Sequence, residues 1–500
     1  MSGVAKKIAG QTAAYGISTI LGRVLNYLLV PLHTSVFTNP EAYGIIGGLY
    51  AYVGFFNVLY TMGLETAFFR FANRPGVNRD QLYNRVLSFI LVTSVLFTGT
   101  ILVFIQPLSE LIDFPDQQLF ISWLAIILAI DAITAIPFAR LRLENKALKF
   151  AGIKMANILL NVLGNVFIFL FCHQIYMGHI LPALKPLVAT FYFPEWGLGY
   201  VFLINLLSNL LLIPMLWREF ARLRFTLDLA FMKPVLKYAY PLMFMGFAGM
   251  VNELLDRILL VEYLPDNFYP GLSNKGALGV YNACYKLAIF MSLAIQAFRY
   301  AGEPFFFSQA KEKNSPQTFA MVMKWFVIVC IFIFLFVSVN LDVFKLFIRS
   351  EAYYQGLGVV PILLIANLFL GVYYNLSVWF KLTDKTQYGT LIGFGGAAIT
   401  ILLNILLIPH LGYMGCAWAT LACYFSMAAA CYFFGQQYYP VPYPVATLLF
   451  YLAVAIGLYF ISTYVDLEAL IWRHLFHLGL CGAFLLLVLV VEKPRLKINK

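Results

Sequence analysis

The sequence predicts an all-α polytopic membrane protein with about fourteen transmembrane helices, arranged as two six-helix lobes around a central cavity plus two C-terminal helices. Three observations carry this prediction: the composition, a series of long apolar segments and an internal repeat. Of the 500 residues, 62% are hydrophobic and 11% are charged, whereas soluble proteins carry about 25% charged residues. A chain of this composition places most of its length in the hydrocarbon core of a bilayer.

Fourteen segments are long and apolar enough to cross a membrane as helices, because about 20 residues span its hydrocarbon core. No loop between them is long enough for a soluble domain, so we expect the protein to work within the membrane. The segments lie near residues 14–37, 42–64, 85–106, 119–138, 151–172, 197–217, 238–262, 278–301, 320–341, 357–380, 388–409, 413–434, 444–463 and 470–491.

The loops between these segments differ in charge. Most of the 34 Lys and Arg residues fall in alternate loops that lie inside if the N-terminus is cytoplasmic. This is the bias that orients membrane proteins, so both termini are predicted to be cytoplasmic. The formal net charge of +11 then reflects orientation, and nucleic acid is not an expected partner. The loops predicted outside hold only Lys185, Lys275, Lys345, Arg349 and Arg473.

The first six segments resemble the next six. Each set has an arginine in its first segment, a glycine at the start of its second and an asparagine in the middle of its fifth; these are Arg23, Gly44 and Asn161, then Arg257, Gly279 and Asn404. An even number of segments per repeat makes the two copies parallel, as in transporters that bind their cargo between two halves. We expect lobes at residues 1–235 and 236–436, followed by two helices and a basic tail at 437–500.

Arg23 is the most informative single residue, because it lies deep within the apolar segment 15–37. An arginine at that depth costs at least ~2.5 kcal/mol, so it must face protein, water or an anion. A structural role would pair it with a buried carboxylate such as Asp131 or Glu65. A functional role would place it in a cavity with Asn26 and Tyr27, facing an anionic cargo.

The seventh segment carries Asn252, Glu253, Asp256 and Arg257. Glu253 and Arg257 are spaced i, i+4 with the acid first, which favours an ion pair along one helix face. Such a pair would let the helix insert, and it could also open to admit an anion. Lys286 in the eighth segment is either an interfacial anchor or a cavity cation.

The remaining charges near the membrane interior fall into two groups. Asp131 is a candidate for proton or cation coupling, or a counter-ion for a basic residue; Glu253 and Asp256 are further candidates for coupling. Charges at helix ends are expected at the surface or at a gate: Glu65, Arg70, Arg299 and Glu303. We expect no metal site and no cofactor.

Several of these motifs together resemble the polysaccharide biosynthesis family of oligosaccharide-lipid flippases, within the multidrug/oligosaccharidyl-lipid/polysaccharide exporter superfamily. The resemblance covers nearly the whole chain and rests on loose helical motifs rather than on one signature. They are Arg23, TNPEAYG (38–44), GLETAFFR (63–70), PFARLR (137–142), DR (256–257), LGVY (278–281) and GYMGCAWAT (412–420).

The resemblance implies alternating access by two lobes and a polyprenyl-pyrophosphate-linked oligosaccharide as cargo. It implies movement to the outer leaflet of a bacterial inner membrane, for surface polysaccharide or lipopolysaccharide synthesis. A polysaccharide polymerase and glycosyltransferases are the implied partners, and an H⁺ or Na⁺ gradient the implied energy source. Arg23 and Arg257, with Lys286, Asn26 and Tyr27, would bind the pyrophosphate or glycan, since arginine can contact a phosphate with two donors.

Other functions remain open at this point. A multidrug or cation antiporter of the same superfamily would need an apolar or acidic cavity, which the basic residues of the first, seventh and eighth segments disfavour. A lipid II flippase also uses a cationic cavity, but its first two segments carry more arginines than the single Arg23 found here. A membrane glycan polymerase or ligase would need catalytic side chains in a large outer loop, so no enzymatic activity is expected.

Overall fold

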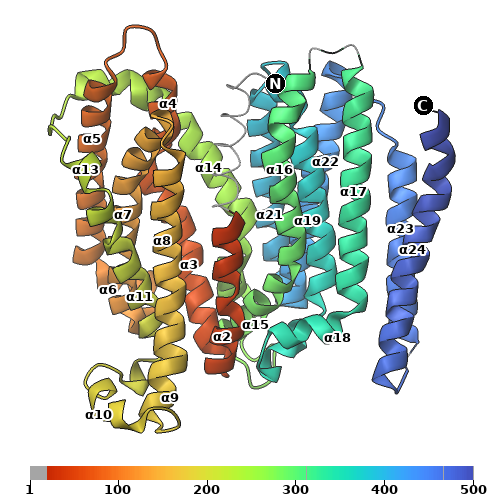
Figure 1. The fold of residues 1–500 in the computed structure, drawn as a ribbon, viewed down its shortest axis with the longest axis horizontal. Coiled ribbons are helices and arrows are strands. Elements are labelled where there is room, and N and C mark those ends of the chain that lie inside the picture. Colours follow the sequence, from red (N-terminus) through yellow and green to blue (C-terminus); the bar gives the residue numbers. More distant parts are fainter. Residues whose placement is uncertain (1–19, 311, 313, 466, 499–500) are drawn as a thin grey trace. The chain divides into compact units, whose positions relative to one another are not determined.

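The computed structural model describes residues 20–310, 312, 314–465 and 467–498, without the side chains of 300, 301, 303, 304 and 494–498. Every regular element in these ranges is helical (Figure 1), which confirms the predicted all-α class. The chain divides into two compact units. Unit 1 comprises Met1–Phe37 and Gly44–Met250, and unit 2 comprises Thr38–Tyr43 and Val251–Lys500. The boundary lies inside a long helix at residue 250, whereas the sequence analysis placed it after residue 235.

Unit 1 is a bundle of long helices joined by short loops. Residues 20–27 are helical, and the other main helices of unit 1 follow in chain order. They are α2 (Leu29–Val36), α3 (Pro40–Thr61), α4 (Leu64–Ala72), α5 (Arg79–Val103), α6 (Ile105–Leu111), α7 (Gln118–Leu143), α8 (Ala147–Val166), α11 (Gly199–Leu210), α12 (Leu212–Met215), α13 (Trp217–Phe220) and the first part of α14 (Leu229–Tyr263).

Short helical turns fill the remaining connections of unit 1. A π-helical turn continues α8, and the loop after it forms a small structure of its own at one end of the bundle (Figure 1). These elements are η1 (Pro115–Gln117), η2 (Phe167–Cys172), α9 (His173–Tyr176), η3 (Pro182–Leu184), α10 (Lys185–Val188) and η4 (Pro194–Trp196).

Unit 2 contains the rest of α14 and the remaining helices. In it, α19 and α21 both pack against α22, and α17 packs against both α23 and α24. Its elements are α15 (Asn274–Tyr285), η5 (Lys286–Ala288), α16 (Ile289–Gln309), α17 (Ser315–Val339), α18 (Leu341–Phe344), η6 (Lys345–Phe347), η7 (Glu351–Gly356), α19 (Val359–Leu376), α20 (Val378–Leu382), α21 (Gln387–Leu411), α22 (Tyr413–Tyr438), α23 (Val445–Tyr464) and α24 (Leu470–Ile498).

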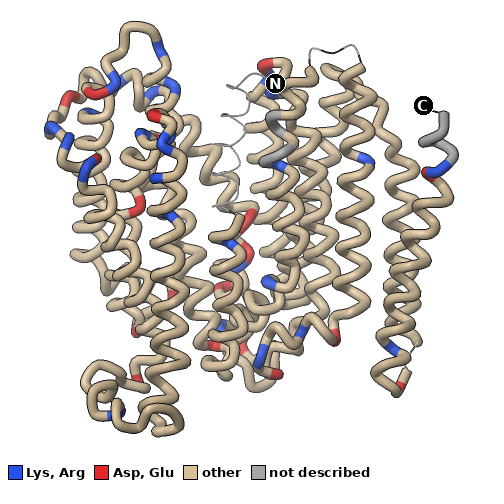
Figure 2. Tube along the Cα trace, viewed as in Figure 1, with Lys and Arg blue, Asp and Glu red and all other residues tan. Residues whose placement is uncertain are grey.

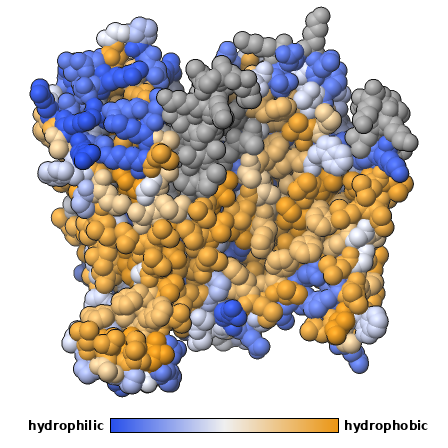
Figure 3. Space-filling model, viewed as in Figure 1, coloured by the Kyte–Doolittle hydropathy of each residue, from blue (hydrophilic) through white to orange (hydrophobic). Residues whose placement is uncertain are grey.

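Eleven helices among the described residues are long and apolar enough to span a membrane. They match eleven of the fourteen predicted segments. The other three are the first segment, of which residues 20–37 are described, the shorter apolar helix Gly199–Met215, and α14. In the space-filling view the sides of the helices are apolar, as a lipid-facing surface requires (Figure 3).

Local sequence explains where several helices begin and end. The Asn78 side chain caps α5 by accepting hydrogen bonds from the backbone N–H groups of Asp80 and Gln81, at 3.0 and 3.1 Å. Gly63 separates α3 from α4 with a φ of 66°, which glycine adopts without strain. A side chain at Gly63 would also meet the carbonyl oxygen of Ala239 at 3.1 Å. This glycine therefore permits the close approach of α14 within unit 1.

Candidate functional site

Arg23 lies on the helical segment 20–27 of unit 1 with an exposed side chain. Within the described part of the chain it forms no ion pair or hydrogen bond. Its neighbour Gly22 packs so closely on α8 that an added Cβ would come within 2.4 Å of Ile158 Cδ1. Among the described residues, the charge of Arg23 therefore has no compensating partner, and the other face of its helix is packed. Asn26 is also exposed, and Tyr27 is half-buried.

The two carboxylates considered as partners of Arg23 are engaged elsewhere. Glu65 forms an ion pair with Arg142. Asp131, on α7, lies within the electrostatic reach of Lys154 on α8. The Lys154 ammonium also lies 4.3 Å from the centre of the Phe138 ring. These contacts therefore do not support a purely structural role for Arg23 as the counter-ion of Glu65 or Asp131.

The sequence analysis did not single out Lys154, which belongs to a polar row along α8. Lys154, Asn157, Asn161 and Asn165 are spaced by three or four residues, so they share one face of the helix. Asn157 donates to the carbonyl oxygen of Ser208 at 2.8 Å. This spacing was visible in the sequence and could have identified the row.

The row ends at a buried histidine of the first segment. His33 Nε2 lies 2.9 Å from Asn165 Oδ1, and Asn165 donates in turn to the carbonyl oxygen of Asn161 at 2.8 Å. A second neutral network lies on α11, where Asn205 donates to Tyr50 OH and Asn209 donates to Asn205 Oδ1. Unit 1 therefore has polar networks built largely from uncharged amides, and the half-buried Lys154 lies on the same face of α8 as the asparagines of the first network.

Unit 2 holds its arginine differently. Arg257 and Asp256 are neighbours on α14, and only 9% and 4% of their surfaces are exposed. The Arg257 guanidinium donates through Nε to Asn282 Oδ1 at 3.0 Å and through Nη1 to the carbonyl oxygen of Glu253 at 2.6 Å. Nη1 also lies 3.6 Å from Asp256 Oδ1, and the guanidinium carbon lies 4.8 Å from the centre of the Tyr285 ring.

The carboxylate of Asp256 is equally well satisfied. Its Oδ2 accepts from the hydroxyl of the fully buried Tyr281 at 2.6 Å, and its Oδ1 accepts from the Arg257 backbone N–H at 2.9 Å. Buried ions require such compensation because they have lost their hydration. Of the three guanidinium nitrogens of Arg257, Nε and Nη1 each donate one hydrogen bond, and Nη2 has no hydrogen-bond partner among the described residues. The guanidinium is thus held through two nitrogens, and the third remains available to a ligand.

The other candidates on α14 and α15 lie around this pair. Arg257 contacts the backbone of Glu253 rather than its side chain, so the i, i+4 ion pair considered from the sequence is replaced by one with the adjacent Asp256. The Glu253 side chain is exposed, and Lys286 is half-buried within electrostatic reach of Arg257 and Glu253. Asn252 Nδ2 donates to the carbonyl oxygen of Gly393 at 3.2 Å, joining α14 to α21.

Two of the four charges predicted at helix ends, Arg70 and Arg299, are in contact with aromatic rings. The Arg70 guanidinium lies 4.0 Å from the centre of the Tyr238 ring, and that of Arg299 lies 4.1 Å from the centre of the Tyr374 ring. The side chain of Glu303 lies outside the described residues. In the loop after α7, burial opposes ionisation of Glu144, but hydrogen bonds from Arg140 and Lys146 hold its pKa below the usual value.

Sequence reasoning also missed a buried ion pair in unit 2. Lys324 on α17 forms an ion pair with Glu492 on α24, and Glu492 is only 1% exposed. The hydroxyl of Tyr451 on α23 donates to Glu492 Oε1 at 3.0 Å. These contacts tie the two C-terminal helices to α17. Lys324 is the single ionisable residue of the apolar helix Ser315–Val339, which was the signal available in the sequence.

Unit 2 also contains an apolar recess of about 310 Å³. Residues of α17, α19, α22 and α23 line it, among them Val327, Leu368, Phe425 and Leu449. Its lining offers no polar surface, so hydrocarbon is the class of ligand that it suits.

Comparison with known proteins identifies the family of this chain. A model of the family described as "Polysaccharide biosynthesis protein" matches residues 8–306. The chain belongs to this family. No curated protein matches it significantly, so membership rests on the family model.

Solved structures of similar fold are transporters. One is described as "Lipid II flippase MurJ, inward closed conformation", with a TM-score of 0.71 and 13% identity, covering 96% of this chain and 99% of that one. A second is an inward-facing multidrug resistance MATE family transporter of the MOP superfamily, with a TM-score of 0.61 and 13% identity, covering 82% and 93%. An outward-facing MATE family transporter has a TM-score of 0.56 and 13% identity, covering 85% and 95%. These similarities establish that this family member shares the fold.

Proposed function

We propose that this protein moves a polyprenyl-pyrophosphate-linked oligosaccharide from the cytoplasmic to the outer leaflet of a bacterial inner membrane. The observation that carries the proposal is the uncompensated charge of Arg23 on an apolar helix, in a chain of the polysaccharide biosynthesis family. A cation at that position is stable only if it meets water or an anion. A pyrophosphate cannot cross hydrocarbon alone, and a guanidinium can hold it with two donors.

The free Nη2 of Arg257 supports the same cargo from unit 2. Arg257 is positioned by Asn282 and by the carbonyl oxygen of Glu253, so it would lose little conformational entropy on binding a phosphate oxygen. Lys286, Asn26 and Tyr27 are proposed as further contacts. A clamp formed by Arg23 and Arg257 across a central cavity stays a prediction.

Orientation and coupling are part of the same proposal. Lys and Arg gather at one end of unit 1, the upper end in Figure 2, and this end is proposed to face the cytoplasm with both termini. An H⁺ or Na⁺ gradient is proposed to drive transport through Asp131, Glu253 or Asp256. Asp131 is the strongest of these candidates, because Lys154 is near enough to influence its charge. Glycosyltransferases and a polymerase would make and consume the cargo.

A second candidate is the flipping of lipid II, which the fold similarity to a lipid II flippase favours. Both lipids carry a pyrophosphate, so the cations discussed above serve either cargo. A cation or drug antiporter is disfavoured, because the charge of Arg23, which has no partner among the described residues, would repel cations.

The proposal is tested with the full-length protein in liposomes that carry a labelled polyprenyl-pyrophosphate oligosaccharide on one leaflet. Its appearance on the other leaflet is followed by accessibility to a glycosidase. We expect protein-dependent transfer of this lipid, faster than transfer of lipid II and of a glycan linked through a neutral lipid. Equal rates for the charged and neutral lipids would contradict the role given to the cations. Faster transfer of lipid II would favour the second candidate.

A further inference from the structure

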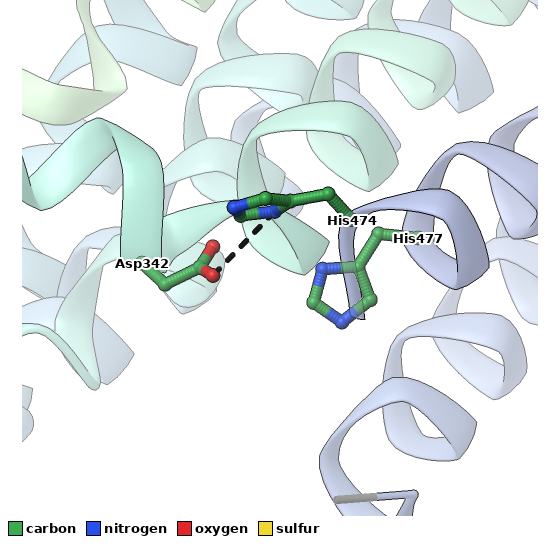
Figure 4. A group of neighbouring side chains, drawn as sticks. All are labelled: Asp342, His474 and His477. Carbon is green, nitrogen blue, oxygen red and sulfur yellow. Dashed lines mark ion pairs between the residues drawn. The ribbon is translucent and has the colours of Figure 1, made fainter. Parts of the chain in front are cut away.

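Three potential metal ligands meet at one end of the last helix of unit 2. His474 and His477 lie on α24, three residues apart and therefore on one face of the helix. Asp342 lies on α18, the short helix that follows α17. One ligand atom from each residue lies within 4.8 Å of the other two. Figure 4 shows the Asp342 carboxylate facing the His474 ring, with the His477 ring beside it from the next turn.

The atoms that face each other in this cluster make no hydrogen bonds to other described residues. Asp342 Oδ2, His474 Nδ1 and His477 Nδ1 are all buried, and none has a hydrogen-bond partner among the described residues. Only the second carboxylate oxygen is occupied, since Oδ1 accepts from the Val343 backbone N–H at 3.0 Å. His477 is 6% exposed, so water does not readily replace the missing partner. Burying unsatisfied polar groups costs about 1–3 kcal/mol each, which one common ligand would relieve.

The spacing suits a small transition-metal ion. A tetrahedral zinc ion with bonds of about 2.0–2.1 Å holds its ligand atoms roughly 3.4 Å apart. Asp342 Oδ2 and His474 Nδ1 are already 3.7 Å apart, and a ligand atom of His477 lies within 4.8 Å of the other two ligand atoms. The neighbouring cation Arg473 donates from Nε and Nη2 to the carbonyl oxygen of Leu467, at 3.1 and 2.9 Å.

We propose that Asp342, His474 and His477 form a binding site for one divalent transition-metal ion of the zinc class. Two imidazoles and one carboxylate favour Zn²⁺, Co²⁺, Ni²⁺ or Cu²⁺ over the oxygen-seeking Mg²⁺ and Ca²⁺. Water would complete the coordination, as at other zinc sites with three protein ligands. The ion would join α24 to the end of α17 through α18. The Lys324–Glu492 ion pair joins the same two helices nearer the other end of α24.

The test uses the full-length protein, purified in detergent through a tag without histidine and freed of metal with a chelator. Titration with Co²⁺, followed by visible absorption, and competition with Zn²⁺ measure affinity, stoichiometry and geometry. We expect one ion per chain, tetrahedral Co²⁺ bands that Zn²⁺ abolishes, and no competition from Mg²⁺. Failure of the wild-type protein to bind Zn²⁺ saturably at one ion per chain would overturn the proposal.

Single variants locate the ion. D342N, H474Q and H477Q should each weaken Zn²⁺ binding at least about 10-fold and remove the rise in unfolding temperature that Zn²⁺ gives the wild type, because an ion that binds the folded state stabilises it. H179Q is the matched control, because His179 is an exposed loop residue that contacts Gln174. Binding that survives all three site variants, or that H179Q weakens equally, would assign the ion to another place. The wild-type titration decides the question even if a variant fails to fold.

Discussion

The two arginines that the repeat pairs, Arg23 in unit 1 and Arg257 in unit 2, have opposite environments. Arg257 is buried, forms an ion pair with Asp256 and donates to Asn282 and Glu253. Arg23 is exposed and lacks any such partner among the described residues. The two positions that the predicted repeat treats as equivalent therefore differ: Arg257 is compensated within unit 2, and Arg23 has no partner among the described residues.

The difference indicates how a deep charge should be interpreted. A charge that the protein itself neutralises can be explained by folding alone, and any functional role is added to that. A charge without compensation needs something from outside the fold, which makes Arg23 the stronger evidence for an anionic cargo. Substitutions can test this contrast, because folding and transport are measured separately.

The largest effect is expected for Arg257→Ala. Removing one member of a buried ion pair costs about 3–5 kcal/mol, and here it leaves Asp256 charged with Tyr281 as its main side-chain partner. We expect a marked fall in unfolding temperature in detergent, together with loss of transport. Asp256→Asn combined with Arg257→Gln should recover much of the stability without recovering transport. Wild-type stability in Arg257→Ala would remove the contrast between the two arginines.

A smaller but similar effect is expected at the other paired cation of unit 2. Glu492→Gln keeps the shape of the side chain but removes the charge that compensates Lys324. We expect a loss of about 2–3 kcal/mol, below the range for deleting a partner outright because the amide can still accept a hydrogen bond. Thermal unfolding measures it, and Glu468→Gln, on a residue with an exposed side chain before α24, is the control. Equal stability of Glu492→Gln and Glu468→Gln would show that the ion pair between Lys324 and Glu492 does not stabilise the fold.

The neutral contacts of unit 1 should matter less. Asn165→Leu removes the partner of His33 Nε2 and the bond to Asn161. An unsatisfied buried donor costs about 1–3 kcal/mol, so we expect a loss near 1–2 kcal/mol in thermal unfolding, with transport measured at a temperature where the protein stays folded. Asn161→Leu at the next position of the row gives a comparison within the same helix. A transport defect without a stability defect would extend the proposed cargo site from Arg23 to α8.

The sequence predicted the helices well because a membrane helix is a local property of about 20 residues. The sequence predicted α14 as a membrane span, although α14 is not among the eleven helices that are apolar enough to be counted as spans in the structure. The sequence could not predict the contacts of Arg257 with Asn282 or of Asp256 with Tyr281, because both partners lie on another helix and periodicity does not say which helix faces meet. The same holds for Asp342, which lies far along the chain from His474 and His477. Lys154 and Lys324 carried a usable signal, each being a cation within an apolar segment.

The smallest effect on folding, and the most informative one on transport, is expected at Arg23. Substitution of an exposed residue without partners changes stability by about 0.5 kcal/mol or less, so Arg23→Ala should unfold at nearly the wild-type temperature. We expect its transport of the pyrophosphate lipid to fall at least about 10-fold, since that is 1.4 kcal/mol of lost binding to the moving anion. Arg218→Ala, at an exposed arginine of α13, controls for the loss of charge alone.

Arg23→Lys then separates the effect of the charge from that of the guanidinium geometry. An intermediate rate fits a guanidinium that holds the phosphate with two donors, because a lysine keeps the charge but not the planar pair. A full rate in Arg23→Lys would reduce the role of Arg23 to its charge, and a full rate in Arg23→Ala would take it out of the cargo site.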